Sequence, residues 1–134
     1  MPHVVLEVPV ALVAGLRETI LLQYRATVEA LHLGFADKSA GDAELSGGRE
    51  RLRQLGELLD RLDAPPKPGA RFVRLEAAAE VLRDAVHGSL IDAGERLAVA
   101  CDGAWRGESP ADGVRSAAEE VVALDGLLRR LGEG

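Results

Sequence analysis

VALVAGLRETILLQYRATVEALHLGF, residues 10–35, is the stretch that decides the fold. Apolar side chains recur in it every three or four residues, which is the period of an α-helix. The spacing predicts one long helix over residues 10–36, with a first apolar stripe that packs against the rest of the chain. The stripe contains Val13, Leu16, Ile20, Tyr24, Val28, Leu31 and Phe35.

The same segment carries a second apolar face on the far side of the expected helix. A helix that is apolar on nearly all sides is buried on nearly all sides. Its covering could come from other helices of the same chain or from the same helix of a second subunit. The second face contains Leu12, Leu22, Ala26, Ala30 and Leu33. If a homodimer forms through this helix, we expect Leu12, Leu22, Ala26 and Leu33 at its interface.

The composition restricts the class of protein. With 134 residues, of which 47% are hydrophobic and 3% aromatic, the chain is long enough for one domain with an aliphatic core. Its net charge of −6 argues against a nucleic acid or an anionic membrane as partner. The single cysteine, Cys101, excludes an intrachain disulfide, and no basic segment precedes the first apolar run as in a secretory signal. We therefore expect a cytoplasmic protein without a membrane span.

A short strand is expected before the long helix. Every second residue of HVVLEV, residues 3–8, is apolar, which is the period of a strand with one buried face. Pro9 then ends the strand and opens the helix. The strand needs a partner for its backbone. That partner is residues 71–74, the same strand of a second subunit, or none if the segment is an extended arm.

Further apolar stripes of helical period predict three more helices, and the PPKPG run at residues 65–69 interrupts the chain between two of them. Short connections favour antiparallel neighbours. We therefore predict an all-α fold, a single helical domain over residues 1–134. It has four helices in up-down-up-down order and a short N-terminal strand or extended arm. The expected helices cover residues 10–36, 44–63, 71–102 and 110–131.

Two pairs of side chains have a spacing that metal sites use. EALH at residues 29–32 has the Glu-x-x-His spacing of carboxylate-bridged di-iron bundles, and DAVH at residues 84–87 is a near copy. However, the four candidates lie outside the main apolar stripes, whereas a site in a bundle core needs ligands that point inward. We therefore expect no cofactor and keep a metal-binding four-helix bundle as an alternative. The candidate ligands are Glu29, His32, Asp84 and His87.

Three short segments resemble known families. The start, MPH before a strand, resembles the tautomerase superfamily, which implies Pro2 as a general base, but the second long strand of that family has no counterpart here. A strand followed by a helix resembles ribbon-helix-helix repressors, with His3 and Glu7 where that family reads bases. WRG at residues 105–107 resembles the turn of the small secreted WxG helical-hairpin proteins, which implies a helical partner protein.

The sequence as a whole favours a non-catalytic helical interaction or regulatory module that self-associates through the helix over residues 10–36. We expect a homodimer with a further protein partner possible, and neither a nucleic acid nor a membrane as ligand. The alternatives are the metal-binding bundle and the secreted WxG-like partner protein.

Overall fold

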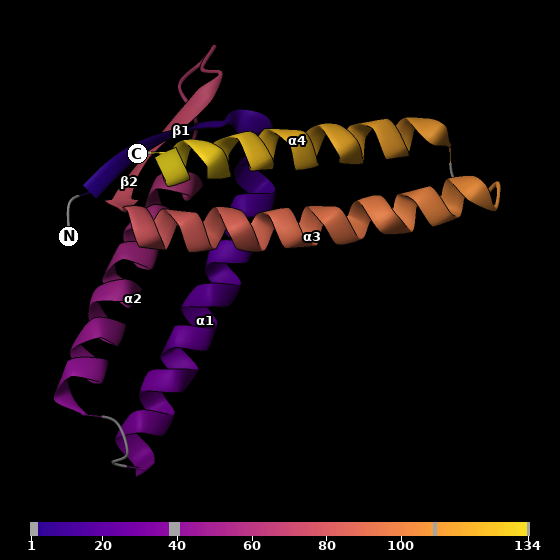
Figure 1. The fold of residues 1–134 in the computed structure, drawn as a ribbon. Helices are drawn as coiled ribbons and strands as arrows, with labels where there is room; N and C mark the ends of the chain where they lie inside the picture. Colours follow the sequence, from indigo (N-terminus) through magenta and orange to yellow (C-terminus); the bar gives the residue numbers. More distant parts are fainter. Residues whose placement is uncertain (1–2, 38–40, 109, 134) are drawn as a thin grey trace. The chain divides into compact units, whose positions relative to one another are not determined.

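The computed structural model describes residues 3–37, 41–108 and 110–133, which are mostly helical (Figure 1). The chain forms two compact units, Met1–Leu82 and Arg83–Gly134. The elements in chain order are β1 (His3–Pro9), a 3-10 turn (Val10–Leu12), α1 (Val13–Asp37), α2 (Asp42–Asp63), β2 (Phe72–Ala78), α3 (Ala79–Trp105) and α4 (Ala111–Glu133).

The prediction of a mostly helical fold with four helices is confirmed, and the short N-terminal strand is present. The all-α arrangement is not confirmed, because in the described chain this strand pairs with a second one in a two-stranded sheet. The helix expected over residues 71–102 begins only at Ala79, since residues 72–78 form β2. Leu75, Glu76 and Ala77 are good helix formers, and pairing with β1 overrides that local preference. The up-down-up-down order and the single domain stay predictions.

β1 and β2 pair in antiparallel fashion, with Leu6 opposite Leu75 and Val8 opposite Val73. Leu6 and Val8 of β1 and Leu75 of β2 are buried. Their neighbours along the strands, Glu7 on β1 and Arg74 and Glu76 on β2, are exposed. The alternation gives the sheet one apolar face, as expected for residues 3–8. Of the three alternatives for the strand, the partner expected at residues 71–74 is confirmed in part, because β2 covers residues 72–78, and the extended arm is excluded.

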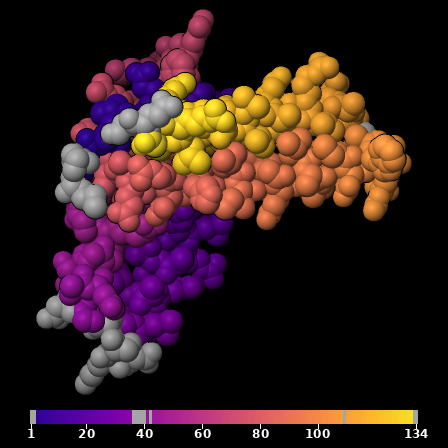
Figure 2. Space-filling model, in the orientation of Figure 1, coloured from indigo at the N-terminus to yellow at the C-terminus, as the bar shows by residue number. Residues whose placement is uncertain are grey.

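α1 and α2, which follow β1 and precede β2 in the sequence, form an antiparallel hairpin. The two helices lie against each other along their length (Figures 1 and 2). Leu16 and Ile20 of α1 and Leu55 and Leu58 of α2 are almost completely buried. These residues belong to the half of the hairpin nearest the sheet. Between residues 21 and 53, by contrast, Gly34 is the one buried residue among those whose burial is described. The distal half of the hairpin is therefore a layer only two helices wide.

Because this half of the hairpin is thin, only part of the expected first apolar stripe of α1 is buried. Leu16 and Ile20 are buried, and Tyr24 and Leu31 are half-buried, as a core stripe requires. The Val28 and Phe35 side chains, which we also placed in the core, are 42% and 52% exposed. The reason is that α2 alone covers this half of α1, and one neighbouring helix cannot enclose a full stripe.

Glycines in α2 set the spacing of the two helices. A Cβ added to Gly48 would lie 2.7 Å from Cδ2 of Leu31, and one added to Gly56 would lie 3.6 Å from Cε2 of Tyr24. Leu31 therefore occupies the space that a side chain at position 48 would need. This explains why a glycine, which weakens a helix, stands at position 48 within α2.

The second unit contains α4 and the part of α3 from Arg83 onward. Its helices are joined by a turn in which Gly107 has a φ of 71°. The Arg96 guanidinium contacts Glu120 across the hairpin, with 2.6 Å between Nη2 and Oε1. Nη2 of Arg83 donates to the carbonyl oxygen of Leu131 at 3.1 Å. The buried residues of this unit are Ala85, Val86, Ser89, Ala93, Leu124, Leu127 and Leu131.

We expect Gly48→Leu to destabilise the protein and Gly47→Leu to leave it equally stable or more stable. Both positions are in α2, so both variants gain helix propensity, but a Cβ at Gly47 meets nothing within 4 Å. At position 48 the new side chain must displace Leu31, and overpacking of this kind costs about 1–3 kcal/mol. Urea unfolding of the two variants measures the difference. Equal free energies of unfolding would contradict the close contact.

Candidate interaction surface

Three of the four predicted interface residues lie on the exposed surface of α1. The Leu22 and Leu33 side chains are 55% and 60% exposed, and Ala26 between them is exposed too. Leu12 differs, because it is only 6% exposed and contributes to the core of the first unit. We call Leu22, Ala26 and Leu33 the outer face of α1.

The outer face points away from α2. The residues of α1 closest to the glycines of α2 are Tyr24 and Leu31. Successive residues of a helix are about 100° apart, which places Leu22 and Leu33 about 180° around the axis from that pair. Packing against α2 therefore cannot bury the outer face. Within the first unit, this surface is the one that the helical hairpin leaves most open.

A second exposed apolar row lies on the flank of α1 nearer to α2. Leu21, Val28 and Phe35 follow one another at intervals of seven residues and are 44%, 42% and 52% exposed. The Arg49 guanidinium lies over the Phe35 ring, with Cζ 5.5 Å from the ring centroid. Our sequence interpretation missed Leu21 and assigned the other two to the core. The seven-residue spacing was the available signal for this row.

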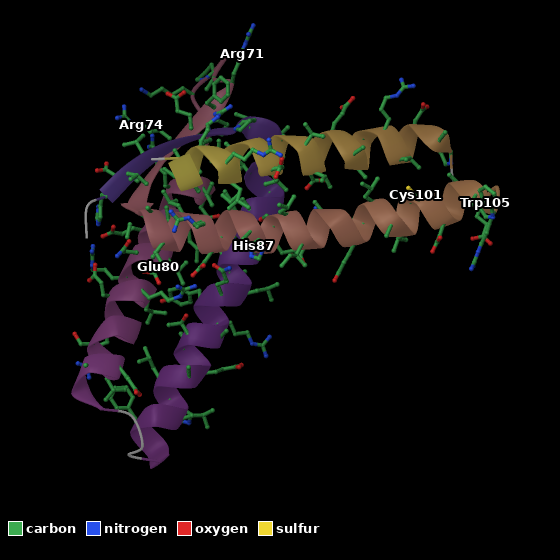
Figure 3. All side chains as sticks on the ribbon, in the orientation of Figure 1. Arg71, Arg74, Glu80, His87, Cys101 and Trp105 are labelled. Carbon is green, nitrogen blue, oxygen red and sulfur yellow. The ribbon has the colours of Figure 1, made fainter. Side chains whose placement is uncertain are left out.

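The two metal-type pairs do not come together in a described site. Glu29 accepts a hydrogen bond from Nε of Arg25 at 3.2 Å, and His32 is exposed on the same helix. Asp84 and His87 are exposed on α3, in the second unit, and Figure 3 labels His87. In the described ranges, no three His, Cys, Asp or Glu side chains gather closely enough to hold an ion. Neither pair therefore gains a third ligand from the residues around it.

The residues that carried the family resemblances are placed as follows. Pro2 lies outside the described residues. His3 and Glu7 are exposed on β1. Trp105 is the last residue of α3 and is 91% exposed, near the exposed thiol of Cys101 (Figure 3).

Side chains of α2 cover the outer edge of β2. The amide oxygen of Gln54 accepts a hydrogen bond from the backbone N–H of Ala78 at 2.8 Å. Nε of Arg61 donates to the carbonyl oxygen of Arg74 at 3.0 Å. Two backbone groups at the edge of the sheet are thereby satisfied by a helix, which is one way in which proteins protect an edge strand.

An open hollow lies next to this edge, and two of the charged side chains that line it have partners. Arg61 bonds the backbone of β2, and Glu57 accepts a hydrogen bond from Nη1 of Arg53 at 2.6 Å. The hollow is lined by His3, Glu57, Leu58, Arg61, Arg74 and Glu76.

Comparison with known proteins gives no relative: no family model matches the chain, and neither a curated protein nor a solved structure is significantly similar to it. No helix among the described residues is both long enough and apolar enough to cross a bilayer. The functional interpretation therefore depends on the surfaces of the chain itself.

The pKa of Glu50 gives a direct test of the side-chain geometry on α2. The Arg53 guanidinium hydrogen-bonds this carboxylate and, with a weaker contribution from Gln54, lowers its pKa from 4.5 to about 2. A carboxyl with a lowered pKa stabilises the fold above pH 4.5, and that stabilisation is lost as the pH falls towards 2.

We expect Arg53→Met to raise the pKa of Glu50 from about 2 towards 4.5, because the guanidinium that stabilises the charged carboxylate is removed. In the wild type, Nε and Nη2 of Arg53 each donate to a different oxygen of the Glu50 carboxylate. Arg53→Lys is the matched variant, because it keeps the positive charge but cannot form both hydrogen bonds. Its Glu50 should have a pKa between those of the other two proteins. Carbon-13 NMR titration of the Glu50 carboxyl measures all three proteins. A pKa that stays near 2 in Arg53→Met would contradict the assigned cause.

Proposed function

We propose that this protein is a non-catalytic helical interaction or regulatory module that self-associates through α1. The observation that supports this function is the outer face of α1, where two leucines more than half exposed flank an alanine. Large exposed apolar side chains grouped on one helix face are typical of association surfaces.

The chemistry of the outer face suits a second copy of the same helix. Ala26 is small, so it allows two helix backbones to approach, while Leu22 and Leu33 supply the apolar area. In a two-fold dimer the same patch is used by both subunits, so a self-complementary apolar row is sufficient. The Arg25–Glu29 ion pair borders the row and keeps its margin polar.

The expected energy is modest. Each leucine that goes from about half exposed to buried contributes roughly 1 kcal/mol, so four leucines in a dimer contribute about 4 kcal/mol. Association costs at least about 4 kcal/mol in lost translational and rotational freedom. The outer face alone therefore gives weak association, and a stable dimer requires further contacts. The single cysteine fits a reducing compartment, which supports a cytoplasmic location for such a dimer.

The double variant Leu22→Glu with Leu33→Glu should be monomeric where the unmodified protein is dimeric, because association would bury four carboxylates. Leu21→Glu with Val28→Glu is the matched control: it adds the same charge to the same helix at positions of similar exposure. Sedimentation velocity reports the subunit number, and circular dichroism reports the fold of each variant. A folded Leu22→Glu, Leu33→Glu protein that sediments like the unmodified one would refute self-association through the outer face.

A further inference from the structure

Residue pairs of the β1–β2 ladder alternate between hydrogen-bonded and non-hydrogen-bonded, and this alternation decides which backbone groups of β1 face away from β2. The N–H of Val10 donates to the carbonyl oxygen of Arg71 at 3.0 Å, and these two residues continue the β1–β2 register. In an antiparallel ladder, hydrogen-bonded and non-hydrogen-bonded pairs alternate. His3, Val5 and Glu7 are therefore in non-hydrogen-bonded pairs with β2. Their N–H and C=O groups point outward, along the free side of β1.

The two edges of the sheet are treated differently. On the β2 edge, Gln54 and Arg61 satisfy backbone groups of Ala78 and Arg74, as described above. On the β1 edge, no hydrogen bond to the outward groups is present among the residues that the structure describes. Val5, in the middle of this edge, has a side chain that is 45% exposed. An edge of this kind is a template for an added strand.

The sequence of β1 is complementary to itself in one register. When two copies pair antiparallel about Val5, that residue lies opposite itself, and His3 of each copy lies opposite Glu7 of the other. All three are residues with outward backbone groups, so each forms a hydrogen-bonded pair across the new interface. The register thus uses six backbone hydrogen bonds and places an imidazole beside a carboxylate twice.

The neighbouring registers are less favourable. Pairing about Glu7 places two carboxylates directly opposite each other, which is destabilising. Pairing that sets Val5 against Glu7 brings His3 opposite Pro9, which has no N–H to donate. Shifts by a single residue move the outward backbone groups out of phase and turn the apolar face of one strand to the opposite side. Charge and hydrogen bonding therefore both favour the register about Val5 over these alternatives.

We propose that β1 pairs with β1 of a second copy of this chain, antiparallel and centred on Val5, to form a continuous four-stranded sheet. This pairing rests on the proposed self-association but uses no residue of the outer face of α1. Pairing of the two β1 strands adds backbone hydrogen bonds to the dimer. The outer face of α1 contributes only side-chain burial. In the combined sheet Glu7 lies between Arg74 of its own chain and His3 of the second copy.

Disulfide cross-linking tests the register directly. In a background with Cys101→Ser, which removes the exposed native thiol, Val5→Cys should form a covalent dimer under mild oxidation. The two Cα atoms of a hydrogen-bonded pair are about 5.5 Å apart, within the range that a disulfide spans. Glu7→Cys is the matched control, because its two copies would be about 13 Å apart along the strands. We expect Val5→Cys to cross-link at least about tenfold faster.

A mixture gives the second readout. His3→Cys and Glu7→Cys, combined in the same background, should form a mixed disulfide faster than Glu7→Cys forms its own. Equal rates for Val5→Cys and Glu7→Cys, or no cross-linking by either, would overturn the proposed pairing. These results are separate from the α1 test: loss of the dimer in Leu22→Glu, Leu33→Glu without cross-linking at Val5 leaves self-association intact and rejects the strand pairing.

Discussion

The seven residue pairs that join β1 to β2 bring together segments more than sixty residues apart in the chain, and the first unit depends on them. They hold the start of α1 and the end of α2 at one sheet, so that the leucines of both helices share a core with Leu6 and Leu75. A two-stranded sheet is marginal by itself and needs a helical layer over its apolar face. Sheet and hairpin therefore stabilise each other.

The same arrangement explains what is left exposed. The sheet is short, so it supports only the near half of the α1–α2 hairpin. Between residues 21 and 53 almost no described residue is buried, since there each helix has mainly the other as its neighbour in the unit. α2 takes the side of α1 that carries Tyr24 and Leu31, where Gly48 and Gly56 allow close contact. The outer face of α1 and the free edge of β1 then have no covering element in the described first unit, and a second copy could cover both.

Much of this architecture follows from the sequence, and the errors have identifiable causes. Helical period and chain breakers located all four helices, and strict alternation located β1. Residues 71–74 were one of the partners expected for β1, but the rest of β2 was assigned to a helix. LEAA, residues 75–78, has helical propensity, and only pairing with β1, a long-range contact, makes it a strand. Leu12 was assigned to an interface because a helical wheel gives faces but not neighbours, and the sheet end of the hairpin buries it. Which backbone groups of β1 point outward can be decided only once the register with β2 is known, and no sequence pattern gives that register.

Native mass spectrometry of the untagged protein, purified without chelator, tests the central claim most directly because it reports subunit number and bound mass together. The account predicts a dimer of two 14.2 kDa chains without additional mass. A single chain at every concentration would mean that the outer face of α1 and the edge of β1 are not joined to a second copy, and would contradict it. A stoichiometric metal would instead favour the pairs that contain His32 and His87.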